Sequence, residues 1–179
     1  EGAKIAFNED GTVDLLVGTQ SNGQGHETVY AQILHELSGI PIEAIRIVQG
    51  DSDLIATGGG TGGSRSVTTQ GTATRATVTK MIAAFTSFVA NQLGVDEADV
   101  SFEDGAFRAE GANAFLTIME AADAAREAGL SELLSHEGRD TLPGRSFPNG
   151  AHVCEVEIDP ITGVMNVDRY TVVDDFGVL

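Results

Sequence analysis

The sequence has one cysteine and no long hydrophobic run, and each scarcity excludes a class of protein. Cys154 is the only cysteine among 179 residues, so the chain forms no internal disulfide and no Cys-x-x-Cys zinc or cluster motif. No uninterrupted apolar run approaches the ~20 residues that a membrane-spanning helix needs. Residues 1–5 show no signal-peptide pattern. These features favour a cytoplasmic protein.

Basic residues are also scarce. The chain has 10 Lys and Arg against 27 Asp and Glu, a formal charge of −17. Nucleic acids and anionic membranes attract proteins mainly through Lys and Arg, so the composition argues against both partners. Hydrophobic residues make up 41% of the chain, which is ordinary for a globular protein. The length predicts one domain, or one domain and part of a second.

Hydrophobic periodicity and turn residues predict a mixture of hairpins and helices. We expect hairpins over residues 4–17, 100–108 and 153–173, a strand over 45–48, and helices over 26–37, 65–93 and 117–128. Residues 131–147 read as a loop. This mixture predicts an α+β fold in which hairpins and a mixed sheet pack against two or three helices.

The chain divides by content into two parts. Residues 1–93 contain two Gly-rich loops that each lead into a helix, and residues 94–179 contain a hairpin, a helix and a C-terminal antiparallel hairpin. The sequence lacks a starting Met and stops just after a strand-like run. We therefore interpret it as part of a larger multidomain subunit.

The two Gly-rich loops are the most informative feature. One covers residues 18–25, and in the other five of the seven residues from 57 to 63 are glycine. A helix N-terminus offers unpaired N–H groups and a partial positive charge, and glycine lets a ligand approach the backbone closely. The loops therefore indicate anion or nucleotide binding. Two surface loops that only turn the chain are the alternative.

Neither loop matches a standard nucleotide motif. Residues 58–63 have the Gly-x4-Gly spacing of a phosphate-binding loop, but Ser64 and Arg65 stand where that loop needs Lys and Ser or Thr. Residues 23–28 break the dinucleotide fingerprint because Thr28 replaces its third glycine. An ordinary ATP or NAD site is therefore not expected.

Metal and acid–base candidates are few. His26-Glu27 begins a zinc-protease motif, but Tyr30 occupies the place of the second His. Asp51 and Asp53 have the spacing of cation ligands, although such residues are common in turns. Three further histidines have no partner at a recognisable spacing, namely His35, His136 and His152. We assign no metal ligand.

Hydrogen-bonding side chains within the loops suggest a composite ligand. Gln24 can donate and accept at once, which matches the edge of a heterocycle. The hydroxyl groups of Ser64 and Ser66 and the fork of Arg65 suit a phosphate or a carbonyl-rich ring. Loop hydrogen bonds and helix capping are their ordinary roles. Together the loops suggest one ligand that has both a ring and a phosphate.

Several motifs occur in an order that resembles a known family. They are Gly18-Thr-Gln-Ser-Asn-Gly-Gln-Gly-His-Glu-Thr28, Gly50-Asp-Ser-Asp53, Gly58 to Ser66, Phe147 to Gly163, and Val173-Asp-Asp-x-Gly177. The set is similar to the second molybdopterin-binding region in the large subunit of the xanthine dehydrogenase/aldehyde oxidase/carbon monoxide dehydrogenase family. The resemblance spans nearly the whole chain. The Gly-Gly-Ser-Arg-Ser form at 62–66 is most like the carbon monoxide dehydrogenase-like branch.

The resemblance implies a molybdopterin cofactor with molybdenum, in its cytosine dinucleotide form. The matching motif positions would be the cofactor contacts, namely Gly23, Gln24, Gly25, Thr61, Gly62, Gly63, Ser64, Arg65 and Ser66. The implied reaction is oxidation of an aldehyde, an N-heterocycle or carbon monoxide with oxygen from water. Electrons would leave through 2Fe-2S clusters and FAD on partner subunits or domains.

The same resemblance limits what this chain does by itself. The family's catalytic Glu lies in a segment beyond residue 179, so no catalytic residue is assigned and residues 1–179 alone are expected to be inactive. The substrate is not identified. Two alternatives stay open: a non-redox anion-binding, nucleotide-binding or assembly module on the same fold, and a structural domain whose glycines serve packing.

Overall fold

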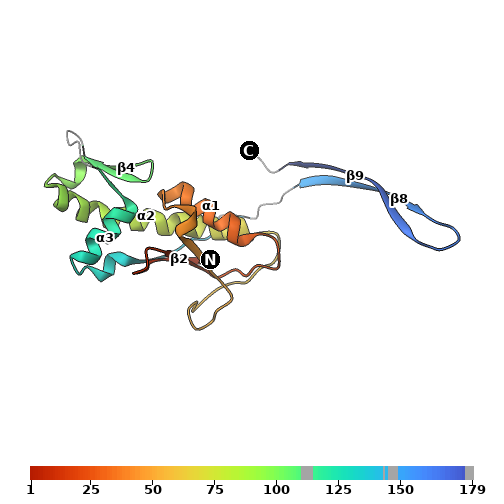
Figure 1. The fold of residues 1–179 in the computed structure, drawn as a ribbon, viewed down its shortest axis with the longest axis horizontal. Helices are drawn as coiled ribbons and strands as arrows, with labels where there is room; N and C mark the ends of the chain where they lie inside the picture. The colour runs from red at the N-terminus through yellow and green to blue at the C-terminus, as the bar shows by residue number, and fades with distance from the viewer. Residues whose placement is uncertain (110–114, 143, 145–148, 176–179) are drawn as a thin grey trace. The chain divides into compact units, whose positions relative to one another are not determined.

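The computed structural model describes residues 1–109, 115–142, 144 and 149–175. They belong to two compact units, Glu1–Pro143 and Gly144–Leu179 (Figure 1). The fold is α+β, as the sequence predicts. Among the described residues, no helix is long and apolar enough to cross a membrane.

A four-stranded mixed sheet organises the first unit, in the order β3-β2-β1-β7. Its strands are β1 (Gly2–Phe7), β2 (Val13–Val17), β3 (Ile45–Val48) and β7 (Ser135–Arg139). β1 and β2 form the predicted antiparallel hairpin, and β3 joins β2 in parallel. Buried residues alternate along β1 and β2 and form one apolar face, which includes Ile5, Val13 and Leu15.

Two helices pack in this unit, α1 (His26–Ser38) and α2 (Ser66–Leu93), both close to their predicted bounds. Phe85 of α2 is fully buried at the centre of the core. Its ring centroid lies 5.9 Å from that of Phe7 in β1 and 6.3 Å from that of Phe107 in a second sheet. α2 therefore joins the two sheets into one core.

The second sheet is antiparallel and carries the third helix. It contains β4 (Val100–Glu103), β5 (Ala106–Ala109) and β6 (Phe115–Thr117), followed by α3 (Ile118–Glu127). Short 3-10 helices cover Ile42–Ala44, Glu97–Asp99 and Ser131–Leu134. The β4–β5 turn packs on the end of α1, where a Cβ at Gly39 would overlap the Cα of Gly105.

The loop predicted over 131–147 is wrong for residues 131–139. They form a 3-10 helix and β7, which pairs with β1. The inward residues of β7 are His136 and Gly138, so the hydrophobic alternation that identifies a strand is missing. Gly138 permits close packing on α2, because a Cβ there would lie 2.8 Å from the backbone nitrogen of Thr77. Residues 143 and 145–147 lie outside the described residues.

The second unit is the predicted C-terminal hairpin, and its strands are longer than expected. β8 (Asn149–Ile158) and β9 (Met165–Asp175) pair in an antiparallel ribbon. In the turn, the Asp159 carboxylate accepts the N–H groups of Thr162 at 2.9 Å and Ile161 at 2.7 Å. These bonds hold the pKa of Asp159 below its ordinary value. Phe147, Pro148 and Gly177 of the family-like motifs lie outside the described residues.

Burial of His136 predicts a pH-dependent stability. Burial lowers the pKa of His136 below its ordinary value of 6.5, against the opposing effect of its hydrogen bond to the Leu133 carbonyl. The unfolded chain binds a proton at His136 more readily than the folded chain does. The contribution of neutral, buried His136 to the free energy of unfolding is therefore complete above about pH 6.5 and is lost as pH falls below that value. We expect His136→Phe to reduce the loss of unfolding free energy between about pH 7.5 and about pH 5.5 in urea titrations. Equal losses in both proteins would contradict this prediction.

Candidate functional site

The two Gly-rich loops begin at the same edge of the main sheet. β2 and β3 are parallel and α1 connects them, so their carboxyl ends lie side by side. Residues 18–25 leave β2 at Val17 and lead into α1, while residues 49–65 leave β3 at Val48 and lead into α2. In open α/β sheets, ligands bind at this end of parallel strands.

Hydrogen bonds join the two loops directly. The N–H of Gly60 donates to the Gly18 carbonyl at 3.2 Å, and the N–H of Gln20 donates to the Thr61 hydroxyl oxygen at 3.1 Å. The Thr61 hydroxyl in turn donates to the Gln20 carbonyl. Segments about 40 residues apart in the sequence thus form one surface.

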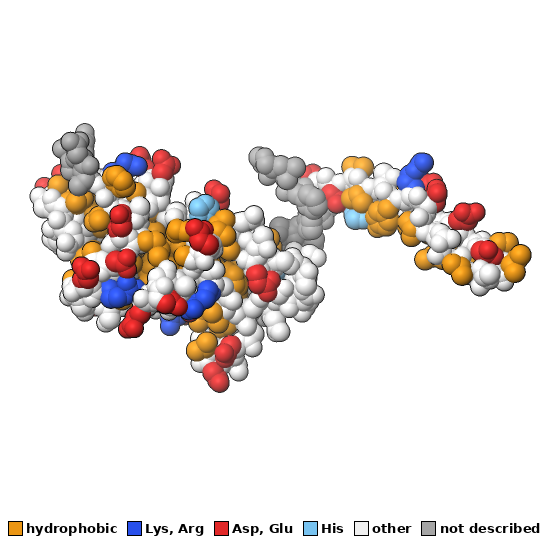
Figure 2. All heavy atoms as spheres, in the orientation of Figure 1, with side chains coloured by type: hydrophobic (Ala, Val, Ile, Leu, Met, Phe, Trp, Pro, Cys, Tyr) orange, Lys and Arg blue, Asp and Glu red, His pale blue; other side chains and the backbone are white. Residues whose placement is uncertain are grey.

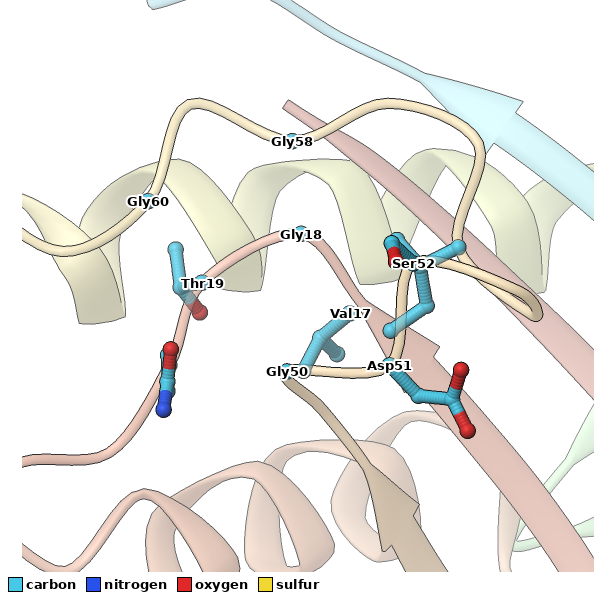
Figure 3. A pocket seen from close by; sticks show the side chains of 10 residues that line it. Val17, Gly18, Thr19, Gly50, Asp51, Ser52, Gly58 and Gly60 are labelled. Atoms are coloured by element: carbon cyan, nitrogen blue, oxygen red, sulfur yellow. The ribbon is translucent and has the colours of Figure 1, made fainter.

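Two glycines make this close approach possible. A Cβ at Gly18 would lie 2.7 Å from the Cα of Gly58, and a Cβ at Gly58 would overlap the Gly18 carbonyl oxygen. Figure 3 shows the segment with Gly58 and Gly60 running past Gly18 and Thr19. A cleft of about 240 Å³ opens beside this contact, lined by Val17, Gly18, Thr19, Gln20, Gly50, Asp51, Ser52, Ile55, Gly58 and Gly60.

The sequence-predicted residues of the first loop lie exposed at the start of α1. Gly23 has a φ of 100°, and Gly25 is the N-cap residue with a φ of 78°. The side-chain amide oxygen (Oε1) of Gln24 accepts the Asn22 N–H at 2.5 Å. Among the described residues, the Gln24 amide nitrogen has no hydrogen-bond acceptor, so it is available to a ligand.

The predicted residues of the second loop, Thr61 to Ser66, lead into α2. Gly63 and Ser64 both have positive φ, at 66° and 53°, so the backbone makes a tight left-handed turn before the helix. Arg65 is the N-cap residue, and the Ser66 hydroxyl donates to Thr61 at 3.4 Å. Only Thr61 of this segment contacts the first loop directly in the hydrogen bonds between described residues.

Both helices that receive the loops have N-termini without a side-chain cap among the described residues. The contrast is α3, where Thr117 and Glu120 form a complete capping box that also lowers the pKa of Glu120. The N-cap residues of α1 and α2 therefore give no side-chain hydrogen bond to the first turns of their helices. The N–H groups of such first turns are suited to hold an anion.

Sequence analysis did not identify the roles of Gln49, Thr19 and Tyr30 in and beside the first loop. Gln49 follows β3, where its amide oxygen accepts the Ser21 N–H at 2.8 Å and its nitrogen donates to Glu27 at 2.6 Å. The Thr19 and Tyr30 hydroxyls lie 2.8 Å apart in the interior, and burial raises the pKa of Tyr30. No local signal in the sequence identifies Gln49, because its partners are 22 and 28 residues away.

Buried polar atoms without a partner gather at the same helix starts. Both ring nitrogens of His26 and the Oε1 atom of Gln70 are buried with no hydrogen-bond partner among the described residues. His26 is the first residue of α1, and Gln70 is the fifth residue of α2. An unpaired buried polar atom costs about 1–3 kcal/mol, so this end of the unit is not optimised for stability alone.

The other predicted candidates have ordinary roles in the fold. Asp51 accepts the Asp53 N–H at 2.9 Å, which is local turn chemistry. Sequence analysis assigned no partner to three histidines, but each is hydrogen-bonded. His35 bonds to the Ile40 carbonyl and His136 to the Leu133 carbonyl, while His152 bonds to the side chains of Tyr170 and Asp174. No group of three or more potential metal ligands occurs among the described residues.

Comparison with known proteins matches this chain to one family. Residues 1–179 match the model of the molybdopterin cofactor-binding domain. The carbon monoxide dehydrogenase large chain of Afipia carboxidovorans is 36% identical over 99% of this chain and 22% of its own length. The nicotine 6-hydroxylase large subunit of Paenarthrobacter nicotinovorans is 32% identical over the same shares.

Solved structures agree with the sequence comparison. A Cu,Mo-CO dehydrogenase in its carbon monoxide-reduced state matches with a TM-score of 0.81 and 36% identity, over 97% of this chain and 22% of that one. Quinoline 2-oxidoreductase from Pseudomonas putida 86 matches with a TM-score of 0.79 at 24% identity, which shows a shared fold. The chain spans 22% of the length of the carbon monoxide dehydrogenase large chain.

The Gly18–Gly58 contact predicts a position-specific effect of added methyl groups. Gly58→Ala must separate the two loops, and we expect a loss of about 1–3 kcal/mol in unfolding free energy. Gly62→Ala is the matched control, because a Cβ there meets nothing within 4 Å and needs no left-handed backbone. Denaturant unfolding of both variants measures the difference. A Gly58→Ala protein as stable as the Gly62→Ala protein would contradict the backbone contact.

Proposed function

Since this chain belongs to the molybdopterin cofactor-binding domain family, we propose that it is the cofactor-binding segment of a molybdenum hydroxylase large subunit. The observation that carries the proposal is the meeting of two Gly-rich loops at two helix N-termini without side-chain caps. One surface then offers backbone N–H groups to a phosphate and amide or hydroxyl groups to a ring.

The residues present fit a pyranopterin dinucleotide. The Gln24 amide and the Thr61–Ser66 backbone provide neutral donors, which can hold an anion in a chain of net charge −17. The glycines keep the backbone accessible, since a Cβ at Gly23, Gly25, Gly62 or Gly63 meets nothing within 4 Å. We propose these positions, with Ser64, Arg65 and Ser66, as the cofactor contacts.

The bound cofactor supplies the redox chemistry, and the chain's own residues bind and orient it. We propose that the parent enzyme oxidises an aldehyde, an N-heterocycle or carbon monoxide with oxygen from water. The cofactor would be the cytosine dinucleotide form, with FAD and 2Fe-2S clusters on partner subunits or domains in the cytoplasm. Relatives named as carbon monoxide dehydrogenase and nicotine 6-hydroxylase large subunits support this class of reaction.

The decisive experiment uses the parent protein purified with its neighbouring subunits from cells that make the cofactor. Molybdenum is measured by elemental analysis, and nucleotides are identified after acid hydrolysis. We expect about one molybdenum per chain and released cytidine phosphate. A nucleotide without molybdenum would favour the non-redox binding module, and the absence of both would favour the structural or assembly module.

Gln24 provides a mutational test of the first loop. Gln24→Glu keeps an oxygen that can accept the Asn22 N–H, but replaces the amide donor with a negative charge. We expect cofactor affinity to fall about tenfold or more, because a hydrogen bond to a charged group contributes about 1.5–3 kcal/mol. Molybdenum content per chain measures the effect, and the melting temperature of the cofactor-free protein should not change.

The exposed Gln32 of α1 provides the control. Gln32→Glu adds the same charge to α1, the helix that follows this loop. We expect it to retain full molybdenum occupancy. If both variants retain the cofactor, or both lose it equally, Gln24 is not a contact.

A further inference from the structure

The β8–β9 ribbon has two chemically different faces. Residues directly opposite each other in an antiparallel pair share a face, and successive residues along one strand point to opposite faces. By the observed register, one face holds Cys154, Val156, Ile158, Met165, Val167, Tyr170 and Val172, with Gly150, His152 and Asp174 at its end. We call it the apolar face. The polar face holds Ala151, Val153, Glu155, Glu157, Asn166, Arg169, Thr171 and Val173.

A β-bulge keeps the apolar face continuous. The register shifts between Glu155 and Val156, which leaves Asp168 as the extra residue of β9. Strict alternation from Tyr170 would bring Asp168 and Asn166 to the apolar face. The shift instead sets Val167 opposite Val156, and the next pair on this face is Ile158 and Met165. The sequence therefore uses one irregularity to keep charge off this face.

The polar side chains of the apolar face bond to one another. The His152 ring donates from Nε2 to the Asp174 carboxylate at 3.2 Å, and its Nδ1 atom shares a hydrogen bond of 3.2 Å with the Tyr170 hydroxyl. The Asp174 carboxylate occupies the space that a Cβ at residue 150 would fill, so Gly150 is required for this arrangement. Burying groups that are already paired costs far less than burying free ones.

The polar face has the opposite character. Glu155 and Arg169 are 3.8 Å apart, and their side chains are 52% and 68% exposed. Glu157 adds another charge, so burial of this face would carry a large desolvation penalty. Hydrophobic atoms gather along the ribbon in Figure 2, and Val167 and Ile158 are 56% and 61% exposed. An isolated two-stranded ribbon is at best marginally stable, so the apolar face needs a cover.

We propose that the apolar face of the ribbon packs against a segment of the parent large subunit outside residues 1–179. This inference rests on the proposed function, because it takes the chain to be part of such a subunit. The matched relatives extend well beyond the ribbon: this chain covers 22% of the carbon monoxide dehydrogenase large chain and 22% of the solved dehydrogenase chain. A segment of the same polypeptide is also favoured by its high effective concentration.

Photo-crosslinking in the purified parent complex tests the occupant. A benzophenone amino acid replaces Val167 on the apolar face, or Val153 on the polar face as the matched control, and crosslinked peptides are identified by mass spectrometry. We expect Val167 crosslinks to large-subunit peptides outside residues 1–179. Crosslinks to residues 1–143, to a flavin or iron–sulfur subunit, or to a second copy of the large subunit would overturn the proposed occupant.

Thiol labelling tests burial without a disruptive substitution. Cys154 lies on the apolar face, and Val153→Cys puts a thiol on the polar face of the same strand. In the native parent complex, we expect a maleimide to label Cys154 at least about tenfold more slowly than Cys at position 153, because a packed face must open before it reacts. Equal rates would overturn the docking proposal.

The same measurements separate this inference from the proposed function. Crosslinking and labelling are repeated on the large subunit from cells that cannot make the cofactor. Protection of Cys154 in this cofactor-free subunit would support the docking surface independently of the cofactor, and it would do so even if the subunit from cells that make the cofactor contained no molybdenum, which would contradict the proposed function. If Cys154 is labelled as fast as a thiol at position 153 in a molybdenum-loaded enzyme, the docking proposal fails and the proposed function stands.

Discussion

The candidate site depends on the contact between the backbones of Gly18 and Gly58. β2 and β3 end side by side, but their loops could still diverge, and the absence of a Cβ at either position lets the two chains touch. The Gly60–Gly18 and Thr61–Gln20 hydrogen bonds follow from that approach. Loops that precede different helices thereby become one surface, which explains why glycines are concentrated here despite their entropic cost.

The N-termini of α1 and α2 lack the kind of side-chain cap that the chain uses at α3. α3 closes its N-terminus with Thr117 and Glu120, so the chain uses an ordinary capping box where nothing else is needed. α1 and α2 begin at Gly25 and Arg65 without such a cap among the described residues. The unpaired side-chain atoms of His26 and Gln70 lie within the first five residues of these helices. Stability is given up where backbone donors face a potential ligand, a pattern typical of functional sites.

Local signals explain which parts of the structure the sequence predicts. The helices, the three hairpins and the Gly-rich loops have strong periodicity or turn residues, and the structure contains them. β7 has none of these, because its inward positions are His136 and a glycine that packs on α2. The Gly18–Gly58 contact and the role of Gln49 were not predictable for a related reason: each joins residues that are far apart in the chain. The cofactor contacts themselves stay predictions.

The two units satisfy their polar groups in opposite ways, and this difference indicates what each contributes. The first unit has its own hydrophobic core around Phe85 but leaves buried side-chain atoms of His26 and Gln70 unpaired at one end, among the described residues. The ribbon has no core of its own, yet His152 on its apolar face is hydrogen-bonded to both Tyr170 and Asp174, beside Gly150. Polar groups left open are suited to a polar ligand, and apolar groups left open are suited to a protein surface. These contrasts are what the two proposals explain: a polar ligand at the loops of the first unit, and a protein surface on the apolar face of the ribbon.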